Sequence, residues 1–101
     1  MTMGQKALAL SEYENAVRVE GGNPELYLVL AKAYENMGEK DLATAQYRKA
    51  SLVSGDNKAL HESLLKAFEA MKRPTEAAME RKELQRIEKK EKFEKEISGQ
   101  K

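Results

Sequence analysis

The chain has 101 residues, and its 18 basic and 17 acidic side chains leave a formal net charge of +1. This length indicates one domain with a modest core, and the balanced charge excludes an overall field that would attract nucleic acid or an anionic membrane. Cysteine is absent, which excludes disulfides and thiolate metal sites, and no apolar run approaches the ~20 residues that a membrane-spanning helix needs.

The N-terminal part of the chain is predicted to form two helices. The spacing of apolar residues indicates an amphipathic helix over about residues 5–19. A second helix is expected over about residues 24–37, because Asn23 is a natural N-cap and Pro24 lacks the N–H that would be unpaired at the first helical position. Gly38 can adopt the left-handed conformation that ends a helix.

The rest of the chain is predicted to form three further helices. They cover about residues 41–53, 58–71 and 75–97, with Asp56 or Asn57 as the N-cap of the middle one. The last is about twice as long as the others, and its second half is rich in Glu and Lys pairs spaced four apart, which favour helix without packing. No segment has a strand pattern. An all-α fold of about five helices with a long C-terminal helix is therefore predicted.

The sequence matches itself at a spacing of 34 residues. A fixed period of this length is typical of stacked two-helix units, so the expected architecture is a set of antiparallel helix-turn-helix repeats. The matching pairs include Leu8 and Leu42, Ala9 and Ala43, Tyr13 and Tyr47, Ala16 and Ala50, Leu30 and Leu64, Lys32 and Lys66, Tyr34 and Phe68, and Glu35 and Glu69.

The unit at residues 24–57 resembles the tetratricopeptide repeat family. The large and small residues that match the family pattern are Tyr27, Leu30, Ala31, Tyr34, Gly38, Ala43, Tyr47 and Ala50. Residues 4–22 resemble the second helix of an incomplete unit, and residues 58–97 a divergent terminal unit. The resemblance implies one α-solenoid domain over residues 1–101. Since the start falls within a unit, a fragment of a longer repeat array is one interpretation.

Divergence of the last unit is typical of a terminal repeat. Lys72 stands where the family pattern has glycine, and Arg81 stands where it has an aromatic residue. The outer face of a terminal repeat has no neighbour, so polar replacements there favour a soluble cap.

No pattern in the sequence indicates an active site, and no catalytic, cofactor-binding or metal-binding residue is predicted. His61 occupies the position of Tyr27 one repeat earlier, which favours a packing or hydrogen-bonding role. The carboxylates at 88, 91, 94 and 96 interleave with lysines, as on a solvated helix face. Nucleic-acid binding is not predicted either, because the lysines of the last helix lack an accompanying series of aromatic residues.

The resemblance implies a protein or peptide partner held in a concave groove, because the first helix of each unit lines the concave side of such a solenoid. In this groove Leu28 and Val29 would form an apolar spot, and Lys32 and Lys66 would hold a carboxylate. The alternative is that these lysines form exposed ion pairs with neighbouring glutamates. The predicted groove residues are Glu25, Leu28, Val29, Lys32, Glu35, Asn36, Glu62, Ser63, Lys66 and Glu69.

Chaperone-binding members of the family use a carboxylate clamp of lysine, asparagine and arginine. The central asparagine of that clamp falls here on Val29 or Ser63, and its later basic residues fall on Ala59 and Ser63. None of these matches. The acidic tails of heat-shock chaperones are therefore disfavoured as ligands, and a different peptide or helix is expected.

Self-association is the alternative function. The first helix lacks a partner helix and is expected to expose Leu8 and Tyr13, while Met79, Phe93 and Ile97 form an apolar stripe on the last helix. The isolated chain is therefore expected to dimerise or to bind an external helix. Because association costs several kcal/mol of translational and rotational freedom, a homodimer formed through such small surfaces is expected to be weak.

Overall fold

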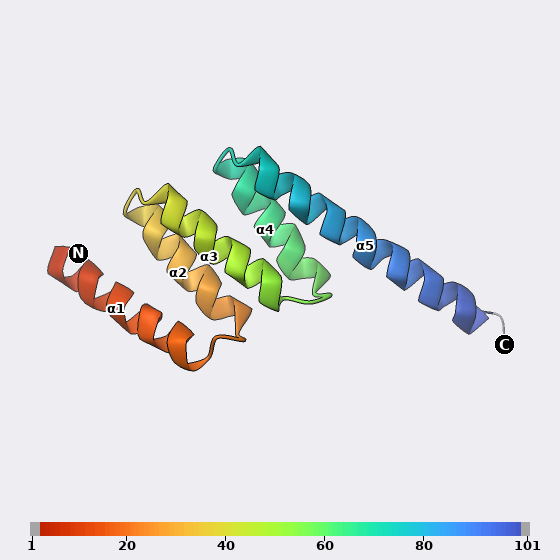
Figure 1. Cartoon of the computed structure of the whole chain (residues 1–101), viewed down its shortest axis with the longest axis horizontal. Helices are drawn as coiled ribbons and strands as arrows, with labels where there is room; N and C mark the ends of the chain where they lie inside the picture. The colour runs from red at the N-terminus through yellow and green to blue at the C-terminus, as the bar shows by residue number, and fades with distance from the viewer. Residues whose placement is uncertain (1–2, 100–101) are drawn as a thin grey trace. The chain divides into compact units, whose positions relative to one another are not determined.

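The structure is a computed structural model that describes residues 3–99, with side chains from residue 8 onward. Within this range every element is a helix and none is a strand, which confirms the predicted all-α fold (Figure 1). Each predicted helix boundary lies within two residues of the observed one. The helices are α1 (Met3–Val19), α2 (Pro24–Asn36), α3 (Lys40–Val53), α4 (Lys58–Ala70) and α5 (Pro74–Gly99).

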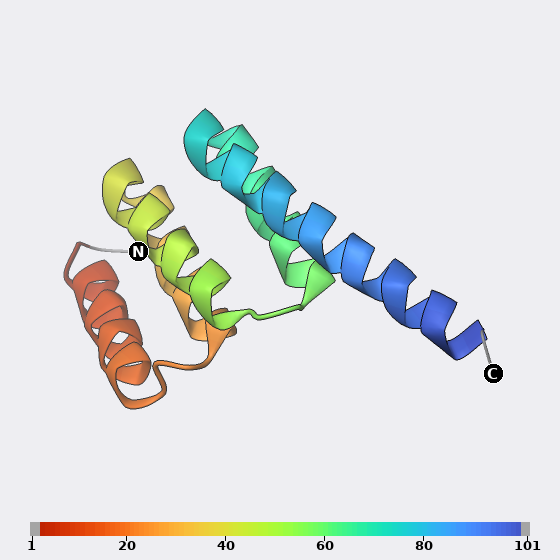
Figure 2. The same ribbon diagram turned by 45° about the vertical axis from the view of Figure 1, so that its right-hand side comes forward.

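The chain divides into two compact units, Met1–Gly55 and Asp56–Lys101. In the first unit α2 packs on α3 over its length and α1 packs on α2 less extensively, and in the second unit α4 packs on α5. Figures 1 and 2 show that α2 and α3 run antiparallel, as do α4 and α5. Each unit therefore contains one antiparallel helix pair, and the first unit carries α1 in addition.

Alanines allow α2 and α3 to approach closely. Ala31 on α2 and Ala43 and Ala50 on α3 have no exposed surface, and Leu30 and Tyr47 are also buried. A side chain of one carbon lets two helix backbones come near each other, while the larger residues fill the space to either side. The predicted alternation of small and large packing positions is thus present in this pair.

Asparagine side chains begin two of the helices, as the sequence predicts. Asn23 Oδ1 accepts the N–H of Glu25 at 3.0 Å, and Asn57 Oδ1 accepts the N–H of Leu60 at 3.2 Å. These bonds satisfy N–H groups that have no partner within the helix.

Asp56, the alternative candidate for the N-cap of α4, forms ion pairs with α5 instead. Its two carboxylate oxygens lie 2.8 Å from Arg86 Nη2 and 2.7 Å from Lys90 Nζ on α5. Hydrogen bonds from these two cations lower the pKa of Asp56 to about 2. The pairs join the start of the second unit to α5, although exposed ion pairs of this kind contribute little to stability.

The turns after α2 and α4 have the same backbone geometry. Gly38 and Lys72, which are 34 positions apart, both have a positive φ, of 79° and 58°. The next residue donates its N–H to the carbonyl five positions back in each turn, at 2.9 Å for Glu39 and 2.8 Å for Arg73. This is the Schellman arrangement that closes a helix C-terminus. The turn therefore keeps its form even where glycine is replaced.

Lys72→Gly is expected to raise the free energy of unfolding by about 0.5 to 1 kcal/mol. A residue with a Cβ atom costs about 1 to 2 kcal/mol when its backbone is left-handed, and glycine removes this cost. The greater chain entropy of glycine in the unfolded state offsets part of that gain in stability. Urea unfolding followed by circular dichroism measures the difference. The control is Lys66→Gly, in the exposed middle of α4, which should lower stability by about 1 kcal/mol. Equal losses in both variants would show that Lys72 carries no strain.

A buried polar pair joins α4 to α5. His61 and Glu80 have side chains only 1% and 2% exposed, and Nδ1 of His61 lies 3.0 Å from Oε2 of Glu80. The predicted packing or hydrogen-bonding role of His61 agrees with this position. Phe68 and Leu64 on α4 and Ile87 on α5 complete the buried side of this unit.

The second half of α5 is less isolated than its sequence indicates. Glu88 and Glu91, which the sequence pairs with lysines four positions later, lie 3.6 and 3.9 Å from Lys58 Nζ at the start of α4. Beyond them, Phe93 and Ile97 are 62% and 52% exposed. The charged stretch therefore first packs beside α4 and then continues as a solvated helix.

Candidate partner-binding groove

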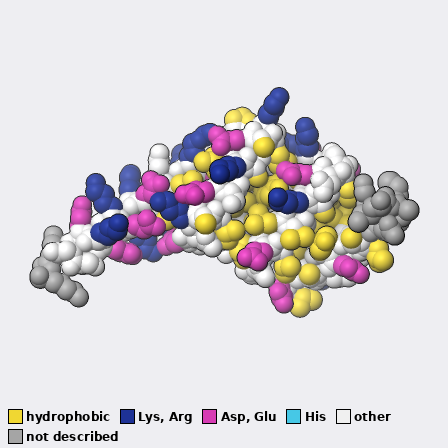
Figure 3. Space-filling model, turned by 180° about the vertical axis from the view of Figure 1, so that it is seen from behind, with side chains coloured by type: hydrophobic (Ala, Val, Ile, Leu, Met, Phe, Trp, Pro, Cys, Tyr) yellow, Lys and Arg dark blue, Asp and Glu magenta, His cyan; other side chains and the backbone are white. Residues whose placement is uncertain are grey.

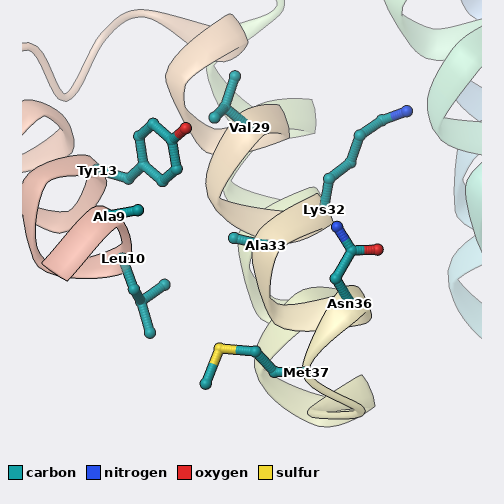
Figure 4. A pocket seen from close by; sticks show the side chains of 8 residues that line it. All are labelled: Ala9, Leu10, Tyr13, Val29, Lys32, Ala33, Asn36 and Met37. Carbon is teal, nitrogen blue, oxygen red and sulfur yellow. The ribbon is translucent and has the colours of Figure 1, made fainter. Parts of the chain in front are cut away.

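A groove with a volume of about 320 Å³ lies between α1 and α2 in the first unit. Its walls come from three residues of α1 and from the second half of α2 and its C-cap (Figure 4). We call it the α1–α2 groove. Its lining residues are Ala9, Leu10, Tyr13, Val29, Lys32, Ala33, Asn36 and Met37.

A hydrogen bond holds α1 against α2. The hydroxyl of Tyr34 donates to Oε1 of Glu14 at 3.0 Å, across a separation of 20 residues. Burial, and after it the bond to the Glu14 carboxylate, raises the pKa of Tyr34 above its ordinary value. This bond links α1 to α2, the two helices that form the groove.

The groove is apolar inside and polar at one edge. In Figure 4 Ala9 and Tyr13 of α1 point toward α2, and Ala33 and Met37 of α2 point toward α1. Both Tyr13 and Met37 are partly exposed, at 37% and 41%. Seen from behind, hydrophobic side chains also gather over the surface near the N-terminal end of the chain, whereas the far end of α5 carries mostly charged ones (Figure 3). Apolar surface in a concave site is typical of a ligand-binding position.

Lys32 and Asn36 form the polar edge. Both leave α2 beside the groove and extend away from α1 (Figure 4). Lys32 is exposed and has no ion-pair partner among the described residues. The groove thus offers an apolar floor next to an ammonium group and an amide, which suits an apolar segment that carries an acidic or hydrogen-bonding group.

Of the residues predicted on α2, Val29, Lys32 and Asn36 line the α1–α2 groove. Glu25 is exposed and Leu28 partly exposed on the same helix, outside the lining. Glu35 is engaged elsewhere, because its carboxylate accepts a hydrogen bond from Tyr47 on α3. Burial and the nearby Glu35 charge raise the pKa of Tyr47 to about 12.

The residues predicted on α4 lie at the surface of the second unit. Glu62, Ser63 and Lys66 are exposed. Glu69 is also exposed and accepts from Arg81 on α5, with Oε2 and Nη2 3.1 Å apart. Because α2 and α4 belong to different compact units, a groove shared by both sets stays a prediction.

Sequence reasoning missed five groove residues. Ala9, Leu10, Ala33 and Met37 were not assigned to any binding surface, and Tyr13 was assigned to an association surface on the first helix but not to a groove with α2. The sequence held one signal for these residues. The first helix matches α3 in sequence, and α3 is covered by α2, so the same face of α1 was expected to be a packing surface.

The comparisons with known proteins yield no match to a family model, to a curated protein or to a solved structure. None of the described helices combines the length and the apolar character required to cross a bilayer.

Proposed function

We propose that this chain is a helical-repeat protein of the tetratricopeptide type that binds a peptide or helix of a partner protein. The 34-residue self-match supports the repeat assignment, as do the matched turns at Gly38 and Lys72. The observation that carries the binding role is the α1–α2 groove, which has an open apolar floor and, at its edge, a lysine without an ion-pair partner in the described part of the chain.

Selection from a displayed library of random 16-residue peptides tests this function. Enriched peptides are expected to bind the wild-type chain at least tenfold more tightly than the Val29→Glu variant, because a carboxylate on the groove wall would lose its hydration against an apolar ligand. Leu52→Glu is the matched control, since Leu52 is 82% exposed on α3 outside the groove. A library without enriched peptides, or equal losses in both variants, would contradict the proposal.

The same peptides test the predicted lysines. Lys32→Ala together with Lys66→Ala should weaken binding at low salt and flatten its salt dependence, because exposed charges act through a screened field. If only Lys32→Ala has an effect, the site is confined to the first unit. Equal affinity at low salt before and after the double change would remove both lysines from the site.

Weak self-association is the second candidate function, and the exposure of Phe93 and Ile97 on α5 favours it. Covering them removes apolar surface at about 25 cal/mol per Å², and this gain is opposed by the loss of translational and rotational freedom on association. A dimer formed through so few residues is therefore expected to be weak. Sedimentation from low to high micromolar concentration should show a dimer that Phe93→Glu abolishes. A constant monomer mass over this range would rule the candidate out.

A further inference from the structure

The α1 wall of the groove matches a surface of α3 that is already covered. Ala9 and Tyr13 lie 34 positions before Ala43 and Tyr47. On α3, Ala43 is 0% and Tyr47 3% exposed, and α3 packs on α2. On α1, Tyr13 is 37% exposed and lines an open groove. One surface pattern thus occurs twice among the described residues of the first unit, once covered by α2 and once lining an open groove.

The covered surface on α3 shows what kind of helix fits the matching surface on α1. Tyr47 donates a hydrogen bond to Glu35 of α2, and Ala31 of α2 is fully buried one turn before that glutamate. The second unit has the same pairing, because Glu69 on α4 accepts from Arg81 on α5. In both antiparallel pairs the earlier helix, α2 or α4, supplies a carboxylate, and the later helix, α3 or α5, supplies the hydrogen-bond donor. Tyr13 is the corresponding donor on α1.

We propose that the α1–α2 groove seats an amphipathic helix of a partner protein that has the pattern of α2, with a glutamate at the Glu35 position that accepts a hydrogen bond from Tyr13. This rests on the binding role proposed above and specifies its ligand. A small residue four positions before the glutamate would lie near Ala9, because Ala31 holds the equivalent position in α2 and is fully buried where α2 packs on α3. Lys32 at the edge of the groove adds a preference for an acidic helix.

A second copy of the chain is a poor source of this helix. The two helices with the required pattern are α2 and α4, and each already packs on the following helix of its own unit. Their glutamates are bonded to Tyr47 and Arg81. A second copy would have to open its own helix pair to supply one, whereas a partner helix needs no such rearrangement.

A synthetic peptide with the sequence of residues 23–37, capped at both ends, is the probe, and fluorescence anisotropy with the full chain measures its affinity. The peptide should bind, and a scrambled peptide of equal composition should not. Tyr13→Phe in the chain and Glu35→Gln in the peptide should each weaken binding about tenfold, as expected for a hydrogen bond to a charged group. Combining the two changes should add no further loss, because both remove the same bond.

Two further variants locate the site on α1. Ala9→Glu should abolish binding by filling the close-contact position, whereas Leu8→Glu should leave it unchanged, because Leu8 is 64% exposed and outside the groove. Circular dichroism establishes that both variants keep their helix content, and Tyr13→Phe tests the site without altering its packing.

Several outcomes would overturn the inference. Binding of the α2 peptide no tighter than that of the scrambled peptide would do so, as would additive losses from Tyr13→Phe and Glu35→Gln. A dimer of the chain alone that Ala9→Glu dissociates would identify a second copy as the occupant instead. If library-selected peptides still bind in a Val29-dependent way while the α2 peptide does not, the proposed function stands and only this ligand assignment fails.

Discussion

Replacing Glu80 with alanine is expected to lower the free energy of unfolding by about 3 to 5 kcal/mol. Glu80 and His61 share a hydrogen bond of 3.0 Å and are almost fully buried between α4 and α5. Removing the Glu80 carboxylate leaves His61 buried without this hydrogen bond and creates a cavity. A domain of this size is stabilised by only about 5 to 15 kcal/mol in total. Urea unfolding followed by circular dichroism should therefore show a large fall in the midpoint.

The control for this prediction is Glu94→Ala, at an exposed position of the same helix, which should change stability by no more than about 0.5 kcal/mol. The 34-residue match offers a second test, because Tyr27 and Gln46 hold the positions of His61 and Glu80 in the first unit. The double variant His61→Tyr with Glu80→Gln should recover much of the stability that Glu80→Ala loses. A loss in Glu80→Ala no larger than in Glu94→Ala would mean that the buried pair does not hold α4 to α5.

Replacing Ala43 with leucine is expected to cost about 1 to 3 kcal/mol. Ala43 is fully buried in α3, which packs on α2, and Ala31 and Ala50 are equally inaccessible. Three added carbons have no free volume at such a contact, so the helices must separate or adopt strained rotamers. The free energy of unfolding, measured in urea, reports the cost.

Ala45→Leu is the matched control for Ala43→Leu. Ala45 lies two residues away on the same helix and is exposed. Leucine and alanine have similar helix propensity, so its effect should stay within about 0.5 kcal/mol. If Ala43→Leu were as well tolerated as Ala45→Leu, the close approach of α2 and α3 would be wrong.

Local rules predicted the helix ends well. Asn23, Asn57 and Gly38 begin or end helices as expected, because capping depends on hydrogen bonds and backbone angles within a few residues. Lys72 was seen as a departure from the repeat, yet its backbone adopts the same left-handed turn as Gly38. The packing of the helix pair and its backbone hydrogen bonds evidently outweigh the local preference of a lysine.

Contacts between distant residues could not be predicted in the same way. Helical spacing did not indicate that the Glu35 carboxylate bonds to Tyr47 on the next helix. The sequence assigned His61 a role without identifying Glu80, which is 19 residues away. Helical periodicity gives the face of a helix that is buried, but the neighbour that covers this face depends on how helices pack.

The α1–α2 groove could be predicted only in part. The self-match placed Tyr13 on a helix without its usual partner, which indicated an open apolar face. The packing of α1 on α2, which includes the bond between Tyr34 and Glu14, determines that Val29 and Met37 form the opposite wall. That geometry follows from tertiary contacts and has no signature in the spacing of residues.

The most direct test of the binding role is an NMR titration of the 15N-labelled chain with a library-selected peptide. The amide signals of Ala9, Tyr13, Val29 and Ala33 should shift together and saturate with a single dissociation constant, because all four residues line the α1–α2 groove. Shifts confined to the end of α5, around Phe93 and Ile97, would place the interaction on the other exposed apolar surface and contradict the account.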